Sequence, residues 1–111
     1  MENKRTMEIW KEVLNSSDYE VSNMGRIRNK KTRHILSVKP TKSHKNPQVF
    51  LGGYYMRKQL TASHLVYDAF LLKPYEKPLY QSMYWDGVKG NRIGYKDGNV
   101  NNIKAENLYR Y

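Results

Sequence analysis

One stretch of the sequence, residues 61–72, has the spacing of an amphipathic helix, and this limits the fold more than any other feature. Leu65 and Ala69 stand four residues apart and would share one face of such a helix, which Thr61 or Ser63 could cap. The other patterned parts of the chain break into short extended segments separated by turn residues. A chain of 111 residues can bury only a modest core. The sequence therefore predicts a small α+β fold of antiparallel hairpins and one main helix.

The clearest hairpin covers residues 19–28, where apolar and polar residues alternate on both sides of a turn. Gly25 supplies a turn position that can take a positive φ. Val21 and Ile27 would face the core, and the period of two then places Arg26 and Arg28 together on the solvent face.

Three further segments have weaker patterns. Residues 35–38 predict a third short strand, and residues 48–60 predict two strands joined by a turn. Residues 8–14 could form a helical turn with Trp10 in the core, and a strand fits them nearly as well.

The charge of the chain is unevenly distributed. Lysine and arginine number 20 against 10 acidic residues, giving a net charge of +10. Residues 21–67 contain no acidic residue, so the whole excess lies on one segment, as a polyanion-binding surface requires. We expect nucleic acid, double-stranded DNA before RNA, as the partner, with an acidic protein as the alternative. The predicted nucleic-acid-binding residues are Arg26, Arg28, Lys30, Lys31, Arg33, Lys39, Lys42, Lys45, Arg57 and Lys58.

Composition excludes several classes of protein. The chain has no cysteine, which rules out disulfides and cysteine-ligated zinc, and His34, His44 and His64 are scattered. No apolar run approaches the length of a membrane span, and the N-terminus lacks a signal-peptide core. We therefore expect a cytoplasmic protein with no membrane partner.

Two motifs resemble parts of the phage HNH homing endonuclease family. Trp10-Lys-Glu followed by the run Tyr-Glu-Val-Ser-Asn-Met-Gly-Arg-Ile-Arg at 19–28 resembles the NUMOD-type DNA-binding module of these enzymes. Residues 93–109, with Asp97-Gly98 and three spaced asparagines, resemble the end of their HNH motif, a ββα-metal fold. The resemblance implies a basic β-rich module at 1–60 and a helix plus HNH-like remnant at 61–111, joined in one compact unit.

The HNH-like motif departs from the family at its reactive positions. Gly94 stands where the resemblance implies an acidic metal ligand, and Tyr95 stands where it implies the general-base histidine. With an ordinary pKa near 10, only about a thousandth of Tyr95 would be ionised near neutral pH. The chain ends at Tyr111, before the helix that completes the metal site in relatives. We assign Asp97 and the asparagines to turn structure.

These departures lead us to expect a nucleic-acid-binding protein without catalytic residues, metal ligands or cofactor, acting in the cytoplasm of a phage-infected or lysogenic host. Two alternatives remain open. An inhibitor or adaptor would block a host protein or a nucleic-acid-guided defence nuclease, which is a ribonucleoprotein. An active nicking enzyme would use Mg²⁺ or Mn²⁺. Residues 73–92 would be an insertion whose aromatic residues extend the core, stack on unpaired bases or dock a protein: Tyr75, Tyr80, Tyr84 and Trp85.

Overall fold

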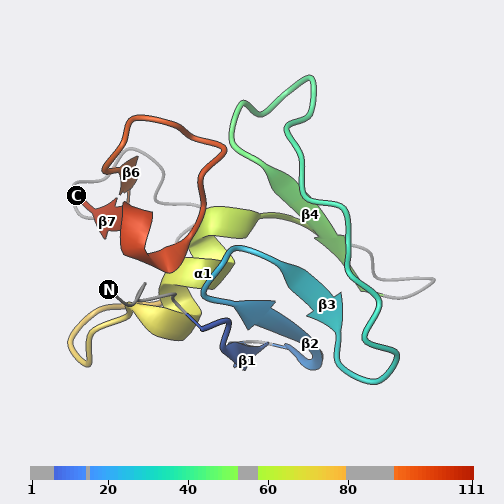
Figure 1. Ribbon diagram of the computed structural model, residues 1–111. Coiled ribbons are helices and arrows are strands. Elements are labelled where there is room, and N and C mark those ends of the chain that lie inside the picture. Colours follow the sequence, from blue (N-terminus) through green and yellow to red (C-terminus); the bar gives the residue numbers. More distant parts are fainter. Residues whose placement is uncertain (1–6, 15, 53–57, 80–91) are drawn as a thin grey trace, which may run out of the picture.

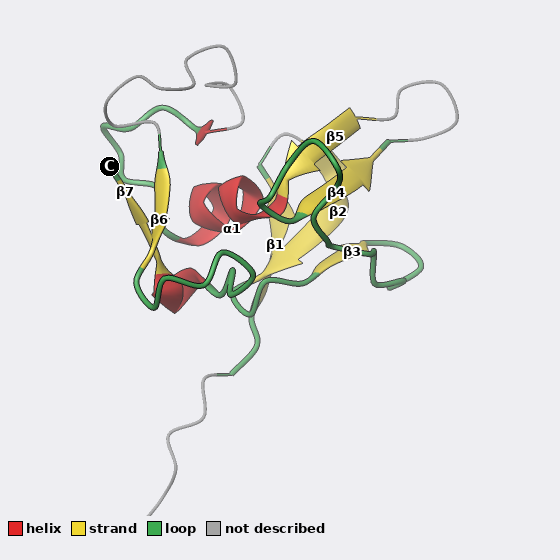
Figure 2. Cartoon of the chain, turned by 90° about the horizontal axis from the view of Figure 1, so that it is seen from above, coloured by secondary structure: helices red, strands yellow, loops and turns green. Residues whose placement is uncertain are grey.

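The computed structural model describes residues 7–14, 16–52, 58–79 and 92–111. Within these ranges the helix α1 (Ala62–Phe70) lies at the centre, between a C-terminal hairpin on one side and the other strands on the other side (Figure 1). A view from above shows the same arrangement (Figure 2). The predicted class of small antiparallel hairpins with one main helix is confirmed.

The strands of the described chain form three antiparallel sheets. The N-terminal sheet has the order β1-β2-β3, from β1 (Trp10–Val13), β2 (Ser16–Ser22) and β3 (Ile27–Asn29). A second sheet pairs β4 (Gln48–Leu51) with β5 (Lys58–Thr61). The C-terminal hairpin pairs β6 (Ile93–Tyr95) with β7 (Leu108–Arg110), which follows the 3₁₀ helix η2 (Ala105–Asn107).

One hydrophobic core joins these elements. The predicted inward residues Val21 and Ile27 are fully buried, and Val66 of α1 is buried with them. Burying such side chains stabilises the fold by roughly 1.5–3 kcal/mol each. The buried apolar residues come from all three sheets, from α1, from η2 and from the segments at residues 79 and 103: Val13, Val21, Ile27, Val49, Leu51, Ala62, Leu65, Val66, Tyr67, Leu79, Ile103, Ala105 and Leu108.

The turn between β2 and β3 rests on the C-terminal part of the chain. Gly25 has a φ of +87°, as the turn requires, and a Cβ at this position would lie 2.6 Å from Cγ1 of Ile103. The backbone N–H of Ala105 donates to the carbonyl oxygen of Asn23 at 2.8 Å. The β2–β3 turn therefore fixes the segment that leads into η2.

Residues 8–14 do not form a helical turn. They contain β1, which pairs with β2 through Trp10↔Ser22 and Lys11↔Val21. Only Val13 of this segment enters the core, while Trp10 is partly exposed and Ile9 and Leu14 are 52% and 47% exposed. The expectation of a core Trp10 is therefore wrong, because strand pairing turns its ring toward the arginines of the neighbouring hairpin.

Two other local predictions need correction. Residues 35–38 do not form a strand: they contribute an isolated bridge between Arg28 and Ile35. Helix α1 has Thr61 at its N-cap, but no side chain caps it. The hydroxyl of Thr61 instead accepts a hydrogen bond from the Gln48 side chain at 3.1 Å. Competition from a tertiary contact thus removes the predicted cap.

Candidate nucleic-acid interface

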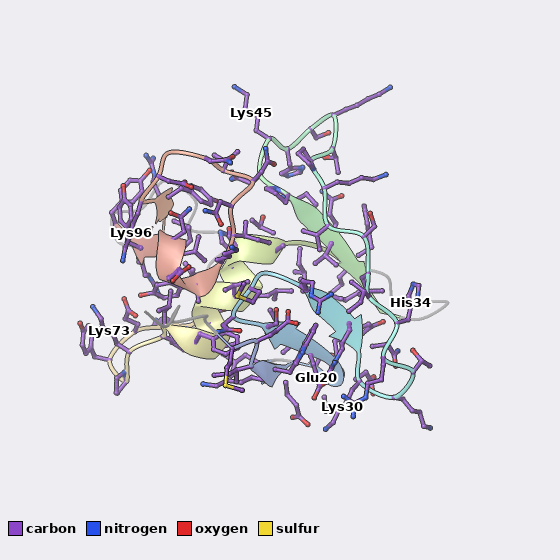
Figure 3. The ribbon with its side chains drawn as sticks, viewed as in Figure 1. Glu20, Lys30, His34, Lys45, Lys73 and Lys96 are labelled. Atoms are coloured by element: carbon purple, nitrogen blue, oxygen red, sulfur yellow. The ribbon has the colours of Figure 1, made fainter. Side chains whose placement is uncertain are left out.

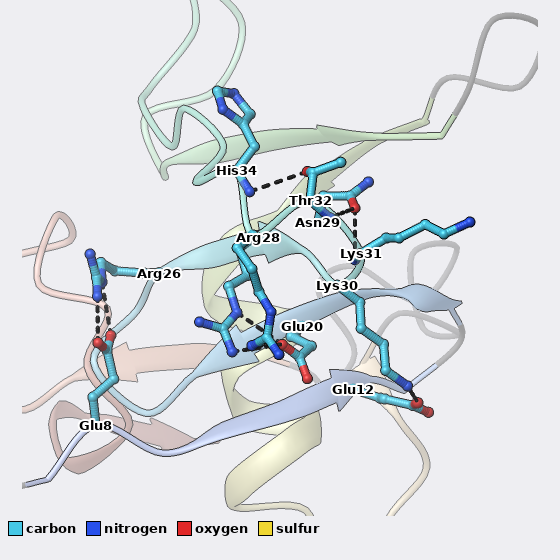
Figure 4. A network of polar contacts seen from close by, with 11 residues as sticks. Glu8, Glu12, Glu20, Arg26, Arg28, Asn29, Lys30, Lys31, Thr32 and His34 are labelled. Atoms are coloured by element: carbon cyan, nitrogen blue, oxygen red, sulfur yellow. Dashed lines mark hydrogen bonds and ion pairs between the residues drawn. The ribbon is translucent and has the colours of Figure 1, made fainter.

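Two arginines of the β2–β3 hairpin are bound to glutamates, Glu8 just before β1 and Glu20 in β2 (Figure 4). Arg26 donates from Nε and Nη2 to the two carboxylate oxygens of Glu8, at 2.8 and 2.5 Å. Arg28 donates to Oε1 of Glu20, with Nη2 at 2.8 Å and Nε at 2.9 Å. The bond from Arg26 lowers the pKa of Glu8 below its ordinary value. Arg26 is half exposed, whereas the Arg28 side chain is only 16% exposed.

The glutamate within β1 neutralises a third cation. Glu12 forms an ion pair with Lys30, and Glu20 also lies 3.8 Å from Arg33. Sequence reasoning missed these pairs because the three glutamates precede the acid-free segment of residues 21–67. The antiparallel order β1-β2-β3 brings them back across the sheet. Much of the cationic excess of the hairpin is therefore balanced in space.

Trp10 holds the two arginines in a stack. The guanidinium carbon of Arg28 lies 3.8 Å from the centre of the Trp10 ring, and that of Arg26 lies 5.5 Å from it. Such cation–π contacts add roughly 0.5–1 kcal/mol at exposed sites. The stack and the ion pairs together restrict both guanidinium groups.

Lys31 projects from a tight turn that follows β3. The side-chain oxygen of Asn29 accepts the backbone N–H groups of Lys31 and Thr32, both at 2.9 Å. Arg33 closes the turn with a φ of +66°. Lys31 is exposed and borders an open groove of about 660 Å³ that Ser16, Ser17 and Thr32 also line.

The loop before β4 carries the next group of cations. Lys39, Lys42 and Lys45 are exposed, and Lys58 is exposed at the start of β5. None of these four lysines, nor Lys31, takes part in an ion pair within the described residues. Figure 3 shows Lys45 at the tip of this loop, far from Lys73 on the other side of the molecule. Arg57 lies outside the described residues.

The outer face of β4 and β5 lies beside this loop. Gln59 donates to Gln48 at 3.3 Å and lies 3.1 Å from Nδ1 of His44, while Phe50 remains 39% exposed. Lys39 and Phe50 line a shallow pocket of about 250 Å³. The unpaired lysines therefore border a face that offers amide groups and an aromatic ring.

The position of Gly94 is filled by a side chain from the neighbouring strand. A Cβ at Gly94 would lie 2.2 Å from Cζ of Tyr109 and 2.6 Å from its hydroxyl oxygen. The ring of Tyr109 therefore lies across β6 only because residue 94 has no side chain. No sequence motif signalled this contact, although Gly94 and Tyr109 are direct partners in the β6–β7 register.

Tyr95 points toward the start of α1. Its hydroxyl donates to Oγ of Ser63 at 3.1 Å and lies 3.5 Å from Oδ1 of Asn46. Burial raises the pKa of Tyr95 above its ordinary value, and the opposing effect of Ser63 is smaller. Near neutral pH, a smaller fraction of the Tyr95 phenol is therefore ionised, and able to act as a base, than for an exposed tyrosine.

Asp97 is held by the asparagines that follow it. Its two carboxylate oxygens accept the side-chain amides of Asn102 and Asn107 at 2.8 and 2.9 Å, and Oδ1 also accepts the N–H of Asn99 at 2.8 Å. Donation from Asn102, then from Asn99 and Asn107, lowers the pKa of Asp97. Gly98 has a φ of +77°. The assignment of this motif to turn structure agrees with these contacts.

The predicted aromatic positions are described only in part. Tyr75 is 80% exposed, while Tyr80, Tyr84 and Trp85 lie outside the described residues, so their stacking or docking role stays a prediction. Among the residues with described positions, no group of three or more histidine, cysteine or acidic side chains could hold a metal ion. None of the described helices has the length and apolar character of a membrane span.

The fold and these motifs define a class: a small α+β protein with an N-terminal β-hairpin module and a C-terminal ββ hairpin on one helix. Residues 8–61 match the NUMOD4 motif. A solved structure concerned with DNA binding and cleavage by the HNH homing endonuclease I-HmuI is similar over 93% of this chain, with a TM-score of 0.68 and 23% sequence identity. Residues 8–61 therefore carry a NUMOD4 motif, and the fold is similar to that of the HNH homing endonuclease I-HmuI, as the resemblance seen in the sequence predicted.

The extent of this relationship is limited. The aligned part covers 52% of the I-HmuI chain, and at this identity the likeness shows the fold alone. A search of the curated proteins finds no match to the chain.

Proposed function

We propose that this chain binds double-stranded DNA through an unpaired cationic edge and does not cleave it. The observation that carries the proposal is the division of the cations: Arg26, Arg28 and Lys30 are each bound to a glutamate. The exposed cations without such a partner in the described chain form the edge: Lys31, Lys39, Lys42, Lys45 and Lys58.

Free lysines suit phosphate contacts better than paired ones. A cation already bound to a carboxylate must lose that partner before it neutralises a phosphate, whereas an exposed lysine needs only to release solvent and counterions. The similar protein I-HmuI binds and cleaves DNA, and this supports DNA as the polyanion. We therefore take the phosphate backbone of a DNA duplex as the ligand of the lysine edge.

The absence of cleavage rests on three positions. Gly94 offers no ligand and its outer side is covered by Tyr109, the Tyr95 hydroxyl is bound to Ser63, and both oxygens of Asp97 are bound to asparagine amides. Hydrolysis assisted by a divalent ion needs several oxygen or nitrogen ligands grouped around it and a base that is unprotonated near neutral pH. The described residues of this motif do not fit such an ion.

The binding proposal is tested by the salt dependence of affinity for a labelled duplex. Each phosphate contact contributes about 0.9 to the slope of log affinity against log salt concentration. The double variant Lys42→Gln/Lys45→Gln should lower that slope by about 1.8. Lys73→Gln/Lys77→Gln removes the same net charge from two exposed lysines on another part of the surface and should leave the slope unchanged. Equal losses in both variants would refute a local interface.

Cleavage is tested with supercoiled plasmid in Mg²⁺ or Mn²⁺. We expect no nicking by the parent protein. Metal-dependent nicking by the parent that disappears in Tyr95→Phe would overturn the proposal. A variant that restores acid and histidine must also remove the covering ring, so the comparison protein carries Gly94→Asp, Tyr95→His and Tyr109→Ala.

A further inference from the structure

The alternation of side chains along β6 and β7 shows which residues lie on the outer face of the C-terminal hairpin. Tyr95 is bonded to α1, Leu108 is buried, and the Arg110 side chain is only 8% exposed above the ring of Tyr67. Neighbouring residues in a strand point to opposite faces. The positions between these, Gly94 and Tyr109, therefore lie on the outer face, away from α1.

Two tyrosines dominate this face. Tyr109 is 45% exposed and Tyr111 is 53% exposed, and their ring centres lie 5.8 Å apart with planes tilted by 38°. The missing side chain at Gly94 gives Tyr109 room to lie along the sheet. Large apolar rings at half exposure cost free energy in water, so two adjacent ones form a surface that a flat ligand would cover favourably.

Two cations flank β6, the strand that pairs with β7. Arg92 exchanges two backbone hydrogen bonds with Tyr111, at 2.8 and 2.9 Å, and Lys96 donates its backbone N–H to Asn107 at 2.8 Å. Both side chains are exposed and belong to no ion pair within the described residues. The acid that follows, Asp97, has both oxygens bound to amides. Figure 3 shows Lys96 on the side of the molecule opposite His34.

We propose that this face binds single-stranded nucleic acid, with two unpaired bases stacked on Tyr109 and Tyr111 and the backbone phosphates contacted by Arg92 and Lys96. Exposed aromatic rings beside a row of cations are the combination that binds single strands without sequence preference, because every base has a π face. Paired bases inside a duplex hide those faces. The site is separate from the lysine edge of the proposed function and does not depend on it.

The test measures affinity of the full chain for a labelled short oligothymidylate by fluorescence anisotropy. Tyr109→Leu/Tyr111→Leu keeps apolar bulk over Gly94 but removes both π faces, and should weaken binding by about tenfold or more. Tyr109→Phe/Tyr111→Phe keeps the rings and should bind as the parent does. The phenylalanine pair, which differs from the parent only in its two hydroxyl groups, is the matched control.

Further measurements separate this site from the lysine edge. Lys42→Gln/Lys45→Gln should weaken duplex binding but leave oligothymidylate binding unchanged, and the leucine pair should do the reverse. In the parent protein, oligothymidylate should shift the NMR ring signals of Tyr109 and Tyr111. This measurement does not depend on the folding of any variant. The proposal is overturned if these ring signals do not shift on addition of oligothymidylate, or if the leucine pair binds oligothymidylate as the parent does.

Discussion

The contact between Gly25 and Ile103 gives the sharpest test of how the two halves of the chain are joined. Gly25 has a φ of +87°, and an added Cβ would lie 2.6 Å from Cγ1 of Ile103 and 3.3 Å from both its carbonyl carbon and its oxygen. Ile103 is 6% exposed, so it cannot move into solvent without leaving the core. The substitution Gly25→Ala therefore adds backbone strain and a steric overlap.

The magnitude follows from these two effects. An L-residue in the left-handed region costs roughly 1–2 kcal/mol, and forcing an extra carbon into packed structure costs roughly 1–3 kcal/mol. Gly25→Ala should therefore lower the free energy of unfolding by about 2–5 kcal/mol. At roughly 4 °C per kcal/mol for a chain of this size, the Tm should fall by roughly 8–20 °C.

Gly98→Ala is the matched control. Gly98 also has a positive φ, +77°, but nothing lies within 4 Å of its added Cβ. Only the backbone cost remains, about 1–2 kcal/mol or roughly 4–8 °C. Urea and thermal denaturation of both variants measure the difference, and a cycle with Ile103→Ala measures the coupling. Equal destabilisation by the two glycine substitutions, with no coupling to Ile103, would refute the reasoning.

Three further predictions concern polar contacts. The double variant Glu8→Gln/Arg26→Gln keeps the net charge and should leave the salt slope of duplex binding unchanged. It should lower the free energy of unfolding by less than about 1 kcal/mol, since exposed ion pairs contribute little. Loss of duplex affinity relative to the parent would contradict this prediction. Burial raises the pKa of Tyr67 to about 12. Because the unfolded phenol ionises near pH 10, stability should fall as pH rises from about 10 to 12, and less so in Tyr67→Phe; equal declines in urea titrations would be contrary evidence. Ser63→Ala should cost about 0.5–1.5 kcal/mol, and adding Tyr95→Phe should cost little more; additive losses would argue against their bond.

Local sequence patterns predicted the elements that depend on neighbouring residues. The alternation around Gly25 gave the β2–β3 hairpin with Val21 and Ile27 inside, and the spacing of four gave α1. The Asp-Gly dipeptide predicted the turn at residues 97–98. The local pattern failed where helix and strand were nearly equally favoured, as at residues 8–14. This segment contains the strand β1 because β2 offers an edge with which it can pair.

The candidate site could be predicted only in part. Counting charges along the chain identified the basic segment, but the ion pairs of Arg26, Arg28 and Lys30 involve glutamates that lie 8–18 residues away. The ring over Gly94 comes from a residue 15 positions later, so a motif scan records an empty position where the fold holds a tyrosine.

Local patterns predicted the β2–β3 hairpin, the β4–β5 pair, the helix, the Asp97 turn and the excess of positive charge, because periodicity, turn chemistry and composition act between near neighbours or over the whole chain. Strand pairing in three dimensions sets which cations remain free of a carboxylate partner and which side chain covers Gly94. Those outcomes depend on which strands pair and in what register, and pairing is set by burial summed over the whole core.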